Sequence, residues 1–252
     1  MKNKLMGGPR GHYGYAISLL LTIYAPVICY YVFCAYDFWV SGSLALLTLS
    51  TLVFYGLTAF TEPGIVPRRS VLVALGVLDA DSPLPVLTEE QVQRGWKFCS
   101  TCKILRPPRA AHCSDTDNCV LLFDHYCIFI NQTIGARNYL FFMLFLSSSV
   151  LLGLATTAAF LLWTSKTKEN AVLMWIISVP LFVVLAAGLA LFCFHLYLNL
   201  AGKTTKEALR GRQGDQDDLH YSCLFRPESM LPSYDAVVLE EELIQVGPVE
   251  QV

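Results

Sequence analysis

The stretch of sequence that decides the fold is Cys99–Asn138, which reads CSTCKILRPPRAAHCSDTDNCVLLFDHYCIFINQTIGARN. It holds five of the nine cysteines and two of the five histidines of the 252-residue chain. Apolar segments long enough to cross a membrane lie on both sides of it in the sequence. We therefore expect this stretch to carry the chemistry of the protein and its neighbours to cross the membrane.

Four apolar runs contain no Asp, Glu, Lys or Arg: Tyr13–Tyr36, Phe38–Thr61, Asn138–Ser165 and Asn170–Phe194. The composition is that of a membrane protein, with 54% hydrophobic residues, 15% charged residues and a mean hydropathy of +0.49. The first run has 24 residues, enough to span a hydrocarbon core about 30 Å thick. It is also too long for the core of a cleavable signal. We predict an all-α polytopic membrane protein with four transmembrane helices, two forming a hairpin over 13–61 and two within 138–201.

The region between the second and third predicted helices, 62–137, is polar and rich in turn residues, and it contains a cysteine-rich domain at about 97–137. Together with the N-terminal segment 1–12 and the tail 202–252, it carries 16 of the 18 Lys and Arg residues. The positive-inside rule places all three segments in the cytosol, where thiolates and zinc sites persist. The net charge of −2 gives no reason to expect a nucleic-acid partner.

Cysteines and a histidine in this domain have the spacing of metal ligands. Cys99 and Cys102 form a CxxC pair, and His112, Cys113 and Cys119 follow within twenty residues. A CxxC turn brings two thiolates to one ion, and two later ligands close a tetrahedral zinc site. Five candidates compete for four places, and the spacing alone does not choose between His112 and Cys113. The alternative is that some of these cysteines are only small buried side chains.

A second pattern, Asp124-His125-Tyr126-Cys127, has the residues of a nucleophilic site. Cysteine attacks as a thiolate, so it needs a base nearby. In an extended backbone His125 shares a face with Cys127, and Asp124 is placed to orient the imidazole, as in a triad. The alternatives are that His125 and Cys127 bind metal, or that they are packing residues.

Three sets of residues carry a family resemblance: CSTCKILRPPRAAHC with the later NCVLLFDHYC and GARNYLFF, then Glu62-Pro63-Gly64, and finally Thr204-Thr205-Lys206-Glu207. The chain resembles the DHHC protein S-acyltransferases, or palmitoyltransferases, in the variant whose signature reads DHYC. Glu62-Pro63-Gly64 is similar to the DPG motif of that family. Thr204, Thr205 and Glu207 match its TTxE motif, and they also have the local pattern of a helix start.

The resemblance implies a small zinc-stabilised domain and a two-step acyl transfer. Cys127 would be the acylated nucleophile, His125 its base, and Asp124 the group that orients the base. The family's first zinc site corresponds to these four positions: Cys99, Cys102, His112 and Cys119. The resemblance thus selects His112 over Cys113 and predicts one Zn²⁺ ion.

The family's second zinc site would use Cys113 and the positions that hold Thr116, Tyr126 and Thr133 here, so three of its four ligands are missing. Loss of three ligands together suggests that the second ion is absent as a unit. We expect Tyr126 and hydrogen bonds from Thr116 and Thr133 to stiffen the segment instead.

Other residues are expected to contact the substrate. Arg106 and Arg109 flank a Pro-Pro turn, and arginine binds phosphate well, so they are predicted to contact acyl-CoA. The alternative is that they meet anionic lipid or only add to the positive-inside bias. Phe129 is expected near the acyl thioester, with Phe142 and Phe145 along the acyl chain. His195, near the end of the fourth run, is expected to reach the membrane interface. The alternative is a functional role, because it is an ionisable group near the end of a membrane helix.

The sequence and the resemblance together predict a protein S-acyltransferase that passes a long-chain acyl group, such as palmitoyl, from acyl-CoA to protein thiols through a thioester on Cys127. Its partners would be fatty acyl-CoA, proteins with membrane-proximal cysteines, the lipid bilayer and, in one reading, an accessory subunit. The location would be a eukaryotic endomembrane: endoplasmic reticulum, Golgi or plasma membrane. The alternatives are a catalytically weak or partner-dependent member of the family, and a membrane-anchored zinc scaffold.

Overall fold

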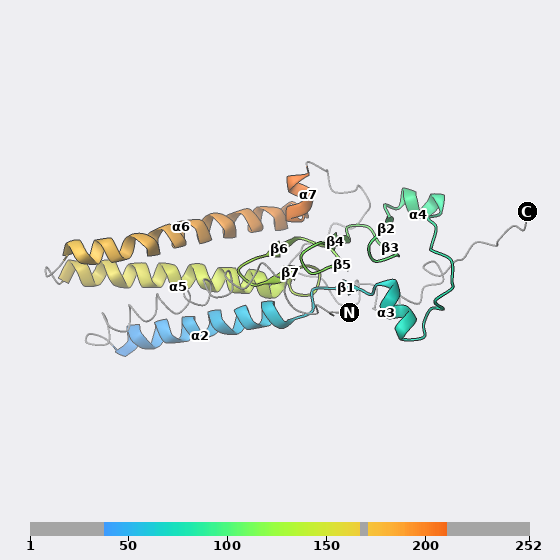
Figure 1. The fold of residues 1–252 in the computed structure, drawn as a ribbon. Coiled ribbons are helices and arrows are strands. Elements are labelled where there is room, and N and C mark those ends of the chain that lie inside the picture. The colour runs from blue at the N-terminus through green and yellow to red at the C-terminus, as the bar shows by residue number, and fades with distance from the viewer. Residues whose placement is uncertain (1–37, 167–170, 211–252) are drawn as a thin grey trace, which may run out of the picture.

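Three long helices dominate the structure, a computed structural model that describes residues 38–166 and 171–210. The helices are α2 (Phe38–Phe60), α5 (Tyr139–Lys166) and α6 (Ala171–Leu200), and they lie side by side with α5 in contact with both others (Figure 1). Each is long and apolar enough to cross a membrane. Three of the four predicted spans are thus present as helices, and the first run, Tyr13–Tyr36, lies outside the described residues.

Several hydroxyl side chains within these helices are satisfied locally, whereas Ser41 Oγ and Thr157 Oγ1 are buried without a hydrogen-bond partner among the described residues. Thr51 and Thr58 in α2, and Thr156 in α5, each donate a hydrogen bond to the backbone carbonyl four residues earlier. In hydrocarbon no water is available to take these bonds, so a polar group in a spanning helix must find its partner inside the protein. The polar residues in the apolar runs are therefore compatible with membrane helices.

The cysteine-rich region lies at one end of the helices and is built from short antiparallel strands (Figure 1). The strands form three small sheets: β1 (Ile65–Val66) with β5 (Asn118–Val120) and β4 (Ala111–Cys113), β2 (Lys97–Cys99) with β3 (Ile104–Arg106), and β6 (His125–Cys127) with β7 (Gln132–Ile134). Short helices complete it: α3 (Arg69–Ala74), α4 (Glu89–Gln93) and α7 (Thr205–Leu209).

The prediction of an all-α fold is therefore wrong for this region and holds only for the spanning segments. Strands of two or three residues are too short to show the alternating pattern by which strands are predicted. Several of the tight turns need a left-handed residue, and non-glycine residues take that conformation here: Lys103, Arg109, Asp117, Leu122 and Asn131. The usual glycine signals of hairpins are thus missing from the sequence.

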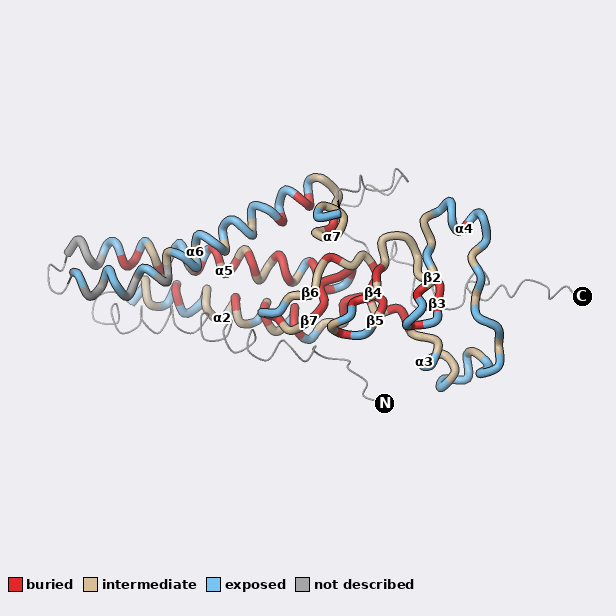
Figure 2. The backbone as a smooth tube through the Cα atoms, turned by 45° about the horizontal axis from the view of Figure 1, so that its top comes forward, coloured by how far each residue is buried: buried red, intermediate tan, exposed pale blue. Residues whose placement is uncertain are grey.

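Asn138 joins the cysteine-rich region to the helices. Its fully buried amide donates to the carbonyl oxygens of Thr58 at 3.3 Å and Thr133 at 2.9 Å, and its Oδ1 accepts from the Gly135 N–H at 2.9 Å. The end of α2, strand β7 and the start of α5 are fixed to one another by this one side chain. Buried residues concentrate in this zone (Figure 2).

The Glu62-Pro63-Gly64 motif makes a second junction between the same segments. The Glu62 carboxylate accepts the backbone N–H groups of Gly64 and Ile65 and pairs with Arg137. Gly64 has a φ of 101°, which L side chains rarely adopt. The turn that leaves α2 is thereby tied to the segment that enters α5.

Substitution of Gly135 by alanine should destabilise the protein. A Cβ at this position would lie 2.5 Å from Cγ1 of Val120 and 2.6 Å from the carbonyl oxygen of Pro63. The backbone must move to relieve that overlap, at a cost of about 1–3 kcal/mol. Gly42→Ala is the matched control, because a Cβ there meets nothing within 4 Å. Thermal unfolding in detergent should show a lower midpoint for Gly135→Ala than for Gly42→Ala, and equal midpoints would contradict the packing argument.

Candidate active site

The candidate catalytic residues lie on the hairpin of β6 and β7, where the cysteine-rich region meets the helices. His125 and Cys127 are two residues apart on β6 and so share a face of the strand. His125 Nδ1 lies 2.7 Å from Oδ2 of Asp124. Cys127 is half-buried and packs against two buried clusters, one that includes Phe142 of α5 and one that includes Ala59 of α2. The side chains that the sequence pattern grouped together are thus in contact.

Asp124 is held by the TTxE motif as well as by His125. Its side chain is 2% exposed, and Thr205 donates to it twice, from the backbone N–H at 2.9 Å and from the hydroxyl at 2.7 Å. Burial by itself raises the pKa of Asp124, but the bonds from His125 and Thr205 outweigh it and hold the pKa below its ordinary value. Asp124 is therefore a fixed, ionised acceptor behind the imidazole.

The charge on Asp124 also changes the titration of His125. Burial lowers the pKa of a histidine, but the hydrogen bond to Asp124 and the interaction with Cys127 raise the pKa of His125 to about 9. The imidazole is consequently protonated at neutral pH and lies beside the sulfur of Cys127.

His195 belongs to this site, and the expectation that it reaches the membrane interface was wrong. Its ring is 2% exposed, with its centroid 5.6 Å from that of His125, and its Nδ1 lies 3.2 Å from the Tyr139 hydroxyl. Phe142 meets both histidine rings edge to face, at centroid distances of 4.9 and 5.3 Å. The two histidines, from α6 and β6, are thus packed against a common aromatic ring.

The aromatic residues expected along the acyl chain lie around Cys127. Phe145 packs against Tyr55 of α2, and the Tyr55 hydroxyl donates to the carbonyl oxygen of Phe129. The Phe129 side chain is itself 46% exposed, directly after the hairpin strand that carries Cys127. The structure thus leaves an apolar side chain partly exposed two residues after Cys127.

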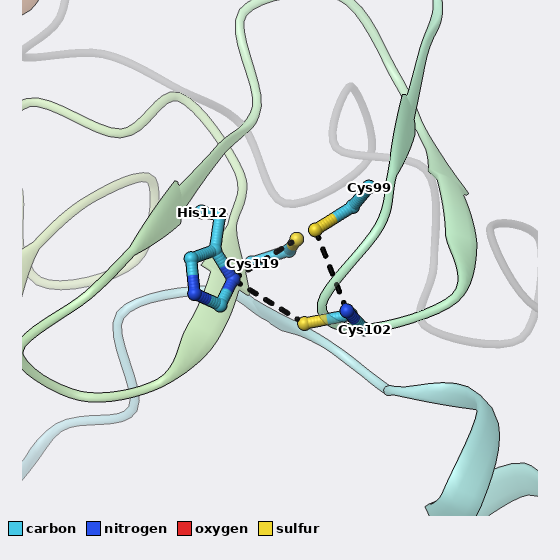
Figure 3. A group of neighbouring side chains, drawn as sticks. All are labelled: Cys99, Cys102, His112 and Cys119. Carbon is cyan, nitrogen blue, oxygen red and sulfur yellow. Dashed lines mark hydrogen bonds between the residues drawn. The ribbon is translucent and has the colours of Figure 1, made fainter.

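The four predicted zinc ligands form one cluster (Figure 3). Ligand atoms of Cys99, Cys102, His112 and Cys119 all lie within 4.8 Å of one another, and the three cysteines are buried. The hydrogen bond from Cys119, with help from the nearby Arg68, lowers the pKa of the Cys102 thiol. Three sulfurs and one imidazole nitrogen on strands and tight turns are a donor set that suits tetrahedral Zn²⁺. Cys113 lies outside the cluster, although it is adjacent in sequence to His112.

Cys113 instead contacts Thr133, which in turn contacts Thr116. The Thr133 hydroxyl donates to Cys113 Sγ at 3.4 Å and lies 3.0 Å from the Thr116 hydroxyl. Tyr126 pairs with Thr133 across the hairpin, but its hydroxyl donates to Asn131 Oδ1 at 2.6 Å. Thr116 and Thr133 thus make hydrogen bonds, as expected, and the Tyr126 hydroxyl holds the turn of the hairpin.

The two arginines predicted to contact acyl-CoA have different surroundings. Arg109 makes a two-pronged ion pair with Glu207 and donates to the Gly202 carbonyl, so its guanidinium is already engaged by protein groups. Arg106 is half-buried, and its Nε has no hydrogen-bond partner within the part of the chain that the structure describes. A phosphate contact of either arginine stays a prediction.

Sequence reasoning missed two features of the site: the packing of His195 on His125, and the Arg109–Glu207 pair. An ionisable residue inside an otherwise charge-free helix was the available signal for His195. No local signal links Arg109 to Glu207, because 98 residues separate them.

Comparison with known proteins agrees with this geometry. A family model described as DHHC palmitoyltransferase matches residues 92–212. The chain is 34% identical over 251 residues to "Probable protein S-acyltransferase 1" of Arabidopsis thaliana, covering 83% of this chain and 72% of that protein. It is 33% identical over 231 residues to "Probable protein S-acyltransferase 6" of the same plant, covering 78% and 55%. For "Palmitoyltransferase ZDHHC5-B" of Danio rerio the identity is 34% over 220 residues, covering 79% and 32%.

The fold and the site define a membrane protein that carries a cysteine-rich domain at one end of its apolar helices. The chain belongs to the DHHC palmitoyltransferase family. It spans about half the length of the first curated relatives it matches, 50% to 55%.

The raised pKa of His125 predicts a pH-dependent stability. The folded state favours the protonated imidazole, so its contribution is fully present below the ordinary pKa of 6.5 and is lost as the pH rises through about 9. Unfolding midpoints measured in detergent between those pH values should fall more steeply for the wild type than for His125→Gln, which cannot titrate. Parallel pH profiles for the two proteins would show that His125 is not held as a cation.

Proposed function

We propose that the protein is a protein S-acyltransferase that moves a long-chain fatty acyl group, such as palmitoyl, from acyl-CoA to cysteine thiols of proteins. The observation that carries this proposal is the bonded Asp124–His125 pair beside Cys127, at the end of apolar helices, in a chain of the DHHC family. The motif is the DHYC variant, with Tyr126 before the nucleophile.

In the first step the Cys127 thiolate attacks the carbonyl carbon of the acyl-CoA thioester. The bond between that carbon and the coenzyme sulfur breaks, and an acyl thioester forms on Cys127. Because Nδ1 of His125 is bonded to Asp124, Nε2 is the ring nitrogen that can give its proton to the departing coenzyme thiolate. The step ends with neutral His125 and free CoA.

In the second step a protein thiol gives its proton to Nε2 of His125, and its sulfur attacks the thioester carbon on Cys127. The Cys127 sulfur leaves as a thiolate beside the restored imidazolium, so the enzyme returns to its starting charge state. Asp124 stays ionised throughout, because Thr205 and His125 supply its hydrogen bonds. Its role is to keep the imidazole in one orientation.

Two residues would contact parts of the acyl-CoA substrate. Phe129, nearly half exposed beside the nucleophile, would contact the first carbons of the acyl chain. Arg106, whose Nε lacks a partner among the described residues, would meet a phosphate of the coenzyme. The rest of the acyl chain would follow the helices, where Phe142 and Phe145 lie near Cys127.

We propose one zinc ion, held by Cys99, Cys102, His112 and Cys119. When bound, the ion has a structural role: it closes the turns that carry β2, β3, β4 and β5 and so supports the catalytic hairpin. The contacts among Cys113, Thr116 and Thr133 would take the place of a second ion.

The proposed topology has four spans, with 13–61 forming the first two and 138–201 the last two. Segments 1–12, 62–137 and 202–252 would face the cytosol of a eukaryotic cell, in the endoplasmic reticulum, Golgi or plasma membrane. The substrates would be proteins with cysteines close to the membrane surface, since Cys127 lies next to the ends of α2 and α5.

A second candidate is a partner-dependent member of the family, which acylates itself only with an accessory subunit. The observation in its favour is the incomplete second ligand set, because fewer metal bonds would hold the catalytic hairpin. A zinc scaffold without catalysis is less well supported, since it needs no bonded Asp124–His125 pair beside a cysteine.

Purified protein given a labelled fatty acyl-CoA should acquire hydroxylamine-sensitive label on Cys127. Cys127→Ser should remove all label, and His125→Ala should slow labelling by about 100-fold or more, the usual contribution of a general acid or base. Cys193→Ser is the matched control, because this cysteine of α6 is exposed and lies outside the Asp124–Cys127 motif, so its loss should not affect labelling.

Label that persists in Cys127→Ser would contradict the assigned nucleophile. Absence of label in the wild type across several acyl chain lengths would favour the partner-dependent candidate, and labelling would then be repeated with membranes that contain the accessory proteins of the host.

The metal content should be about one zinc per chain, as expected for a single closed ligand set. Cys99→Ser should lose that zinc and the folded cysteine-rich domain together.

The triple variant Thr116→Cys, Tyr126→His, Thr133→Cys should gain a second zinc, because positions 126 and 133 face each other across the hairpin and 116 contacts 133. The double variant Thr116→Cys, Thr133→Cys, which keeps Tyr126, is its control. Two zinc ions in the wild-type protein would overturn the single-site assignment.

A further inference from the structure

Arg68 and Asp117 form an ion pair beside the Cys and His cluster. Each of the two side chains also faces one of the ligands proposed for zinc: Arg68 faces Cys102, and Asp117 faces His112. We propose that this pair supports the metal centre from outside: it orients two of the ligands and sets how tightly the ion is retained. The inference rests on the proposed zinc site and does not depend on acyl transfer.

The ring of His112 lies between the sulfur ligands and Asp117. Its Nδ1 is 3.4 Å from Cys102 Sγ and 3.9 Å from Cys119 Sγ, so this nitrogen faces the other ligand atoms (Figure 3). Its Nε2 is 3.6 Å from Asp117 Oδ1, which is longer than a hydrogen bond, so the carboxylate acts on the ring through its charge. A negative charge on this side favours the tautomer with the proton on Nε2 and leaves the Nδ1 lone pair for a metal.

Arg68 acts on a different ligand. Its Nη2 donates to Cys102 Sγ at 3.9 Å and to the backbone carbonyl oxygen of Asp117 at 3.0 Å, and it lies 3.0 Å from the Asp117 carboxylate. Three thiolates and a neutral imidazole around one divalent ion leave a net negative charge. Cys102 is only 2% exposed, and a buried negative charge is costly unless a cation or a donor lies nearby. The guanidinium of Arg68 supplies both.

The turn between β4 and β5 places Asp117 for these contacts. The two strands pair His112 with Cys119, and Asp117 immediately precedes β5 with a φ of 54°. Aspartate is one of the few residues other than glycine that adopt this left-handed conformation readily. Both the carbonyl oxygen and the carboxylate of Asp117 contact the same guanidinium, so the ion pair also fixes the turn that carries two of the proposed ligands.

Backbone contacts fix the position of Arg68. Val66 of β1 pairs with Cys119 of β5, and the N–H of Arg69 donates to the Cys102 carbonyl oxygen at 3.0 Å. Arg68 lies between these two contacts in the sequence, so its side chain starts next to the cluster. The chain that follows α2 thus meets two of the four proposed ligands through its backbone and one of them through a charged side chain.

The pair contributes little as an isolated salt bridge. Its side chains are 28% and 51% exposed, and exposed ion pairs stabilise proteins only weakly. Contacts that orient metal ligands have a larger effect, because their loss commonly lowers metal affinity by about 10- to 100-fold. The two roles differ in one testable respect. An ion pair that only joins two segments works in either orientation, whereas the proposed role needs the cation at Cys102 and the anion at His112.

Release of zinc to an excess of a chromogenic chelator tests the proposal on the full chain purified in detergent. Arg68→Gln and Asp117→Asn should each release zinc at least about tenfold faster than the wild type. Arg68→Lys should be intermediate, because it keeps the charge but not the fork of donors. The double reversal Arg68→Asp, Asp117→Arg should release zinc at least as fast as the single variants, because it places a carboxylate beside the thiolates.

An exposed pair of the same charges provides the matched controls. Arg94→Gln and Glu90→Gln each remove one member of the Arg94–Glu90 pair on α4 and should release zinc at the wild-type rate. The unfolding midpoint of each zinc-saturated variant is measured as well, and release is compared well below all midpoints. A general loss of stability is thereby separated from weaker retention of the metal.

The double reversal gives the decisive result. The proposal is overturned if that variant retains zinc as the wild type does, because the two residues would then act only as an ion pair. It is also overturned if both single variants release zinc at the wild-type rate. A wild type that holds no zinc would defeat the proposed zinc site and this inference with it. A wild type that retains zinc but is not acylated on Cys127 would defeat the proposed transfer and leave this inference standing.

Discussion

A buried carboxylate is the constraint on which the site depends. Asp124 is almost fully enclosed, and an ionised group in that position is tolerated only if its hydrogen bonds are supplied by the protein. His125 provides one bond and Thr205 provides two, from segments 81 residues apart in sequence. The fold must therefore bring the β6–β7 hairpin and the start of α7 to the same point. If either segment were displaced, the buried Asp124 carboxylate would lose hydrogen bonds. Without the Asp124 contact, the pKa of His125 would no longer be raised by it.

The rest of the architecture can be understood as the means of bringing these segments together. Asn138 fixes the base of the hairpin to the ends of α2 and α5 by three hydrogen bonds. α6 returns along α5 and ends next to the hairpin, with His195 packed on His125 (Figure 1). The four-residue Cys and His cluster closes the turns of the strands, where no large hydrophobic core is available to do so. The apolar helices and the cysteine-rich region thus meet at the hairpin, through Asn138 and through the contact of His195 with His125.

The sequence predicted the parts of this arrangement that depend on local pattern. The second, third and fourth charge-free runs coincide with α2, α5 and α6, and CxxC spacing found the ligand cluster. The resemblance was needed to prefer His112 over Cys113. The short strands were not predicted, because their turns use left-handed Lys103, Asp117 and Asn131 instead of glycine. The burial of His195 and the pairing of Arg109 with Glu207 depend on contacts between distant segments, and no periodicity or spacing in the chain records them.

A single zinc site, as we propose, has a consequence for how the β6–β7 hairpin is held. A structural zinc site in a small domain contributes about 10–16 kcal/mol to folding, whereas a single intramolecular hydrogen bond contributes about 0.5–1.5 kcal/mol. The bonds among Thr116, Thr133 and Cys113 and the bond from Tyr126 to Asn131 are thus too few to match an ion. The hairpin in this chain must take more of its rigidity from contacts outside itself. Asn138 holds its β7 side, and the Asp124–Thr205 bonds hold the entrance to its β6 side. α7 is held in turn by Arg109 and Glu207, so the bonds from Thr205 to Asp124 depend on an ion pair between residues 98 positions apart in sequence.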